Sequence, residues 1–258
     1  MHVARIAAGL FLASLGAAQT SVPKGPPETV ASGEALVDRG EKALEAGHTN
    51  EAMDIFRRAA AIGNVDAMMH LGVMYGSGRG TDVDYNAAMA WFQRAAGGGN
   101  SQAMCNIGVL YYQGLGRPRN YAEAMAWFRK SAYDGNTEAM FNVGVFYRDG
   151  LGVRADVVEA MKWFKKAAGA GDGTAANAVG VLYQKGLGVP VNYGEAMSWY
   201  QKAAAGGNAA AMYNVGVLFE GGLGVAADRG KAMEWYRQAA AAGSGPAQEA
   251  LKSLAAKE

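Results

Sequence analysis

Apolar residues along this chain recur with helical spacing, and that spacing is itself repeated every 36 residues. Five glycines keep the period: Gly72, Gly108, Gly144, Gly180 and Gly216. All the tryptophans and five of the methionines keep it too: Trp91, Trp127, Trp163, Trp199, Trp235, Met89, Met125, Met161, Met197 and Met233. A fixed period of roughly 20–50 residues is the signature of a stacked repeat protein. Residues shared by every repeat are therefore expected to hold the stack together, and specific chemistry is expected where the repeats differ.

Each repeat is predicted to contain two short helices. In the segment that begins at Asn100, apolar residues from Ala103 to Tyr111 follow i, i+4, i+7 spacing, as on one face of a helix. The glycines of Gly114–Gly116 end this helix. Asn120 then begins the second helix, with Glu123 three residues later as its capping-box partner.

Short polar residues stand before the predicted helices in the same register, and glycines follow them. The first helices are preceded by Asn64, Asn100, Asn136, Asp172, Asn208 and Ser244, and the second helices by Asp84, Asn120, Asp156, Asn192 and Asp228. The second helices are followed by Gly63, Gly99, Gly135, Gly171, Gly207 and Gly243. These residue types cap the two ends of helices, so the pattern predicts where each helix begins and ends.

The five periodic glycines fall inside first helices, where glycine costs about 0.5–1 kcal/mol relative to alanine. Such a repeated cost indicates a close approach of the paired helix. We expect the tryptophan and methionine of the second helix to pack over the gap.

The repeats at the two ends differ from the rest. Residues 34–63 form a shorter unit with Ile55 in the place of tryptophan, and residues 244–258 form a single helix. Between them lie five 36-residue repeats at 64–99, 100–135, 136–171, 172–207 and 208–243. Terminal units of a solenoid must cap its exposed core, so atypical ends are expected.

The N-terminus is predicted to be a signal peptide, residues 1–18, followed by a flexible linker, residues 19–33. Arg5 precedes the apolar run Ile6–Leu15, and small residues follow for cleavage. A retained membrane anchor is the alternative, but the run is shorter than the ~20 residues that span a bilayer. We therefore expect a periplasmic or secreted protein, with no membrane insertion after cleavage.

Charge and composition argue against several function classes. The chain has 24 basic and 23 acidic residues, and loss of Arg5 with the signal leaves the charges equal. A neutral protein has no broad attraction for nucleic acid or anionic membranes. With one cysteine, Cys105, the chain forms no internal disulfide, and its three histidines give no metal-ligand spacing. No catalytic motif is visible, so no metal, no cofactor and no enzyme activity are expected.

The repeat pattern strongly resembles the Sel1-like repeats of the tetratricopeptide repeat superfamily. It is carried by Ala-Met-x-x-Leu-Gly-x-x-Tyr-x-x-Gly-x-Gly at Ala67–Gly80 and by Ala-Met-x-Trp-Phe at Ala88–Phe92. The resemblance implies an all-α fold, an α/α solenoid in which helix hairpins stack into a right-handed superhelix. First helices would line the concave groove, and second helices the convex face. It also implies a monomeric bacterial adaptor that binds protein or peptide partners.

Three rows of first-helix residues would then face the groove. The first row lies three residues before each periodic glycine and consists of Met69, Cys105, Phe141, Asn177 and Tyr213. The second row lies two residues before it and consists of His70, Asn106, Asn142, Ala178 and Asn214. The third row lies one residue after it and consists of Val73, Val109, Val145, Val181 and Val217. The candidate peptide-binding residues are Met69, His70, Cys105, Asn106, Phe141, Asn142, Asn177, Tyr213 and Asn214.

The variable row offers aromatic anchors, and asparagine amides pair with an extended peptide backbone. Two alternatives stay open: the asparagines serve contacts between repeats, and the valines serve packing. The outer positions Asp66, Gln102, Glu138, Thr174 and Ala210 carry no basic residue, so no carboxylate clamp is expected. The function indicated is an adaptor that regulates a membrane sensor or an envelope process. A secreted host-contact factor and a cell-wall or β-lactam-acting enzyme are the alternatives.

Overall fold

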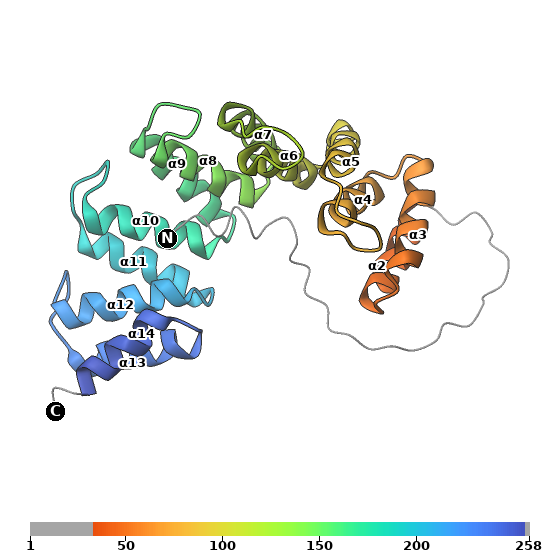
Figure 1. Cartoon of the computed structure of the whole chain (residues 1–258). Coiled ribbons are helices and arrows are strands. Elements are labelled where there is room, and N and C mark those ends of the chain that lie inside the picture. The colour runs from red at the N-terminus through yellow and green to blue at the C-terminus, as the bar shows by residue number, and fades with distance from the viewer. Residues whose placement is uncertain (1–32, 256–258) are drawn as a thin grey trace. The chain divides into compact units, whose positions relative to one another are not determined.

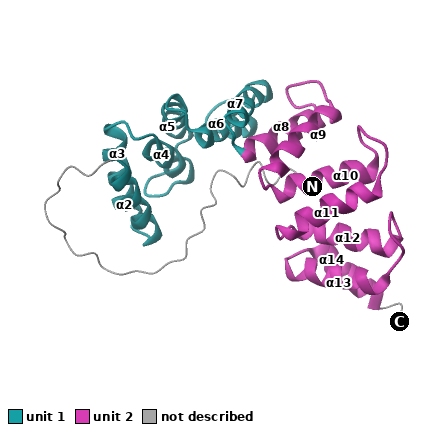
Figure 2. Ribbon diagram, turned by 180° about the vertical axis from the view of Figure 1, so that it is seen from behind, with its two compact units in different colours: residues 1–136 teal, residues 137–258 magenta. Residues whose placement is uncertain are grey.

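The computed structural model describes residues 33–255 as helices joined by short loops. Over that range the chain forms thirteen α-helices and no strand. It divides into two compact units, one up to Asn136 and one from Thr137 onward (Figure 2). The predicted signal peptide and all but the last residue of the predicted linker lie outside the described residues. In residues 33–255 no helix combines the length and hydrophobicity that crossing a bilayer requires.

The first unit consists of three helix pairs. In chain order its helices are α2 (Gly33–Glu45), α3 (Thr49–Ala61), α4 (Val65–Ser77), α5 (Tyr85–Gly97), α6 (Ser101–Gln113) and α7 (Tyr121–Tyr133) (Figure 1). Within each pair the two helices pack along their length, and each pair packs on the next through α3 with α4 and α5 with α6.

The second unit continues the same arrangement and ends in a single helix. Its helices are α8 (Thr137–Asp149), α9 (Val157–Gly169), α10 (Gly173–Lys185), α11 (Tyr193–Ala205), α12 (Ala209–Gly221), α13 (Arg229–Ala241) and α14 (Gly245–Ala255). The predicted all-α fold of stacked helix hairpins is confirmed. Within each unit a helix contacts mainly its neighbours in sequence, so each repeat shares its core with the adjacent repeats of the same unit.

The predicted caps hold the helix ends. Asn64 Oδ1 accepts a hydrogen bond from the Ala67 N–H at 2.8 Å, and Asn120 Oδ1 accepts one from the Glu123 N–H at 3.1 Å. The reciprocal half of the predicted capping box is wrong, because the Asn120 N–H donates instead to Tyr111 O at 2.9 Å. The cap residue therefore ties the start of the second helix to the end of the first.

The interior glycines make room for an aromatic ring, but not for the one expected. A Cβ at Gly144 would lie 2.6 Å from Phe164, and the other four glycines face Phe92, Phe128, Tyr200 and Tyr236 in the same way. Each of these rings is buried and follows the repeat's tryptophan by one residue. The prediction that tryptophan and methionine fill the gap is wrong. The rotation of the second helix about its axis points the residue after the tryptophan, and not the tryptophan itself, toward the glycine.

Four of the five tryptophans instead lie under a basic side chain of their own helix. The Arg94 guanidinium lies 4.6 Å from the Trp91 ring centroid, and Lys166 Nζ lies 4.3 Å from that of Trp163. Such cation–π contacts stabilise a surface by about 0.5–1 kcal/mol each. Lys166, in the last turn of α9, therefore has the Trp163 ring as a definite partner.

The cap asparagines of the first helices also join neighbouring repeats. Asn100 Nδ2 donates to Asp66 Oδ1 at 3.1 Å, and Asn136 Nδ2 donates to Gln102 Oε1 at 2.9 Å. Asn208 Nδ2 donates more weakly, to Thr174 Oγ1 at 3.4 Å. An amide caps the helix with its oxygen and reaches the previous repeat with its nitrogen, which aspartate cannot do.

Asn100→Asp is therefore expected to lower the free energy of unfolding by about 1 kcal/mol. The new carboxylate still caps α6, but it loses the bond to Asp66 and faces a second negative charge. Asn208→Asp is the matched control, since the Thr174 hydroxyl can donate to the new carboxylate. Urea unfolding of the two variants measures this difference. An equal loss of unfolding free energy in both would contradict a stabilising role for the hydrogen bond between Asn100 and Asp66.

Candidate functional site

The candidate binding surface is the set of nine first-helix side chains that the sequence predicts to face the groove. The structure divides the nine residues predicted from the sequence into two groups. Five are buried: Cys105, Asn106, Phe141, Asn142 and Asn177. Four keep partial solvent exposure: Met69, His70, Tyr213 and Asn214. Peptide contact stays a prediction for all nine residues, and only the four partly exposed ones have substantial solvent-accessible surface.

Several of the nine residues contact other repeats or the core aromatic residues. The Phe141 ring lies 5.4 Å from that of Phe164, centroid to centroid. Asn106 Oδ1 accepts a bond of 3.4 Å from Gln102, and Asn177 Oδ1 accepts one of 2.9 Å from Asn214 in the next repeat. These contacts give the buried residues a part in packing within and between repeats.

One partly exposed face of α12 carries three different kinds of side chain. Tyr213, Asn214 and Val217 are spaced i, i+1 and i+4, so they share one side of the helix, and all three are half-buried. The Tyr213 ring rests against Tyr236, with centroids 5.5 Å apart, and Asn214 is held by its bond to Asn177. The face therefore presents an aromatic ring, an amide and an aliphatic group in fixed positions.

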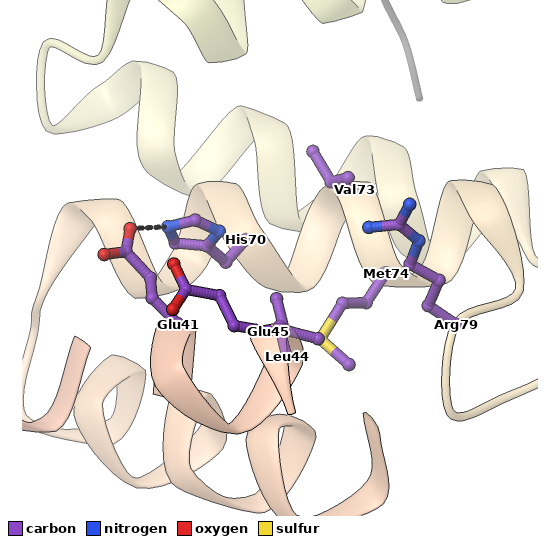
Figure 3. A pocket seen from close by; sticks show the side chains of 7 residues that line it. All are labelled: Glu41, Leu44, Glu45, His70, Val73, Met74 and Arg79. Carbon is purple, nitrogen blue, oxygen red and sulfur yellow. Dashed lines mark hydrogen bonds and ion pairs between the residues drawn. The ribbon is translucent and has the colours of Figure 1, made fainter. Parts of the chain in front are cut away.

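The other partly exposed candidates belong to α4 in the first unit, where one of them lines a cavity. Met69, His70 and Val73 occupy the equivalent positions on α4, and His70 and Val73 line a cavity of about 300 Å³ between α2 and α4 (Figure 3). The cavity is lined by Glu41, Leu44, Glu45, His70, Val73, Met74 and Arg79. Only His70 among these was a candidate from the sequence. The α2 residues were missed because the short repeat at residues 34–63 lacks the 36-residue pattern that aligned the others.

His70 is held firmly at one end of this cavity. Its ring stacks on Phe56 with centroids 4.6 Å apart and an angle of 8° between the planes. Its Nε2 lies 3.0 Å from Glu41 Oε1. Burial lowers the pKa of His70, and the charges of Glu41 and Asp66 offset this only in part. The imidazole is therefore neutral at pH 7, and it donates to Glu41 when the proton is on Nε2.

Two further features of residues 33–255 concern metal binding and thiol chemistry. Over that range no group of three or more His, Cys, Asp and Glu side chains is placed to hold a metal ion. Cys105 is a buried thiol.

Comparisons with known proteins agree with this architecture. The family model of the Sel1 repeat matches five segments, at residues 65–100, 101–136, 137–172, 173–208 and 209–244. The crystal structure of c5321, described as a protective antigen present in uropathogenic Escherichia coli strains displaying an SLR fold, is 33% identical with a TM-score of 0.80. That match covers 86% of this chain and 48% of c5321, so the chain spans about half of that relative.

Two further solved structures bear on the fold. A Sel1 repeat protein from Oxalobacter formigenes is 32% identical with a TM-score of 0.80, over 84% of this chain and 89% of that one. The immunity protein Pa5087 from Pseudomonas aeruginosa is 20% identical with a TM-score of 0.54 over 84% of each chain, which supports the fold alone. No curated protein sequence matches the chain.

Proposed function

Because the chain belongs to the Sel1 repeat family, we propose that it is a non-catalytic adaptor that binds a peptide or partner protein on the groove face of its first helices. The observation that carries this proposal is the partly exposed face of α12, where Tyr213, Asn214 and Val217 present an aromatic ring, an amide and an aliphatic group together. Aromatic anchors supply most of the binding energy of protein interfaces, and amides pair with peptide backbones.

The adaptor works in the bacterial periplasm or outside the cell, where it regulates a membrane sensor or an envelope process. The support is the predicted signal peptide at residues 1–18 and the balanced charge of the remaining chain. A second candidate is a secreted host-contact factor. It is favoured by the likeness to c5321, which is described as a protective antigen.

Capture of partners from the native envelope fraction tests the proposal. The double variant Tyr213→Ala, Asn214→Ala is expected to lose at least about nine-tenths of the partner captured by the wild type, since loss of an interface anchor costs roughly 2 kcal/mol or more. Tyr133→Ala is the matched control, because Tyr133 is 65% exposed on the second helix α7. Circular dichroism must show that both variants fold. Equal capture by both variants would contradict binding through the first helices.

A further inference from the structure

We propose that the cavity between α2 and α4 binds an aliphatic primary ammonium group, the end of a lysine side chain presented by a partner peptide. The inference rests on the proposed function, since the peptide carries the lysine. The chemistry of the cavity itself is argued from its own residues.

The cavity has the size of a single side chain. Helix α2 supplies Glu41, Leu44 and Glu45, helix α4 supplies three residues, and Arg79 comes from the loop that follows α4. Its volume of about 300 Å³ is at the lower end of the range of ligand pockets. It therefore fits one extended residue of a peptide better than a folded surface.

Two carboxylates are gathered at one end of the cavity. Glu41 and Glu45 are one helical turn apart on α2, so they lie on the same face, where like charges repel. Figure 3 shows both side chains on the His70 side and Arg79 on the opposite side. A cation between the carboxylates removes their repulsion, whereas Arg79 repels a cation from the other side. The charge pattern thus fixes which way the ammonium points.

His70 does not neutralise the negative charge of the Glu41 and Glu45 carboxylates. The groups around it are Glu41 and Glu45 from α2, Asp66 from its own helix, and Arg79 across the cavity. Because burial keeps the imidazole neutral at pH 7, it orients the Glu41 carboxylate at 3.0 Å without cancelling its charge. The second Glu41 oxygen and the Glu45 carboxylate then supply acceptors for an ammonium, which has three donors.

The wall between the charged ends is apolar. Leu44, Val73 and Met74 line it, and Met74 is almost fully buried. A lysine stem of four methylene groups packs on such a surface while its charged head stays among polar groups. An apolar wall that leads to an acidic end matches lysine, and it does not match a small metal cation or a simple anion.

A titration of the full chain with Nα-acetyl-lysine amide tests the proposal. Methionine methyl groups are labelled with ¹³C, so that Met74 reports on the cavity by NMR. A ligand of this size is expected to shift the Met74 signal saturably with a Kd of roughly 1 mM. Nα-acetyl-norleucine amide, which has an apolar chain but no ammonium, is expected to leave the signal unchanged at the same concentrations.

Glu45→Gln is expected to raise the Kd at least about fivefold, because it removes one charge and keeps the side-chain size. Glu123→Gln, a carboxylate variant on the exposed face of α7, is the matched control and is expected to leave the Kd unchanged. No saturable shift, equal binding of the norleucine amide, or an equal effect of both variants would overturn the proposal. If the chain captures a partner through Tyr213 but does not bind the lysine amide, only the proposal for the cavity is refuted. If it binds the lysine amide but captures no partner, only the adaptor proposal is refuted.

Discussion

Gly144→Leu is expected to lower the free energy of unfolding of the second unit by about 3 kcal/mol or more. A Cβ at this position would lie 2.6 Å from Cδ1 and Cε1 of Phe164, and leucine adds three further carbon atoms. The Phe164 ring is fully buried, so it has no space into which to move. Extra atoms in a packed core typically cost 1–3 kcal/mol, and more where the neighbour is fixed, as here.

The matched control is Gly169→Leu in the partner helix α9. A side chain at Gly169 meets nothing within 4 Å, and the backbone there is suitable for any residue. Leucine is a better helix former than glycine, so this change is expected to be neutral or slightly stabilising. The loop variant Arg154→Leu is expected to be close to neutral too, because Arg154 is exposed. Thermal unfolding followed by circular dichroism compares them, and equal midpoints for both glycine variants would refute the close approach.

Phe92→Ala is expected to cost about 3–5 kcal/mol, whereas Trp91→Ala is expected to cost roughly half as much. Phe92 is completely buried over Gly72, and its removal leaves a cavity between α4 and α5. Trp91 is half-buried under Arg94, so part of its surface is in water already. Urea unfolding of the two variants measures the difference. A larger loss for Trp91→Ala would mean that the tryptophan, and not the phenylalanine, closes the helix pair.

The same pair of residues shows what the sequence could and could not predict. The period identifies Gly72, Trp91 and Phe92 as structural, because glycine and tryptophan recur in all five repeats and the residue after the tryptophan is always phenylalanine or tyrosine. It does not say which of the two adjacent aromatic residues faces inward, because both positions are aromatic in every repeat. Successive residues are turned by about 100° around a helix, so this choice depends on the exact phase of the second helix against the first.

Contacts between repeats were harder still to predict. The period marks Asn100 and Asp66 as members of two recurring rows, but it does not say that one row hydrogen-bonds to the other. The binding rows were likewise identified by position and not by exposure. Asn142 is 1% exposed although it is equivalent to the half-buried Asn214, because burial depends on how closely the neighbouring elements pack. The α2 residues of the cavity lie outside the 36-residue pattern, so the sequence gives them no equivalent positions in the other repeats.

Site-specific photocrosslinking at Tyr213 is the most direct test of the adaptor proposal. A benzophenone amino acid is placed at position 213 in one variant and at position 133 in another, and both are irradiated in the native envelope fraction. We predict one discrete crosslinked protein from position 213 and none from position 133, because Tyr133 lies on the exposed side of a second helix. The same crosslinked protein from both positions, or one from position 133 alone, would contradict binding through the first helices.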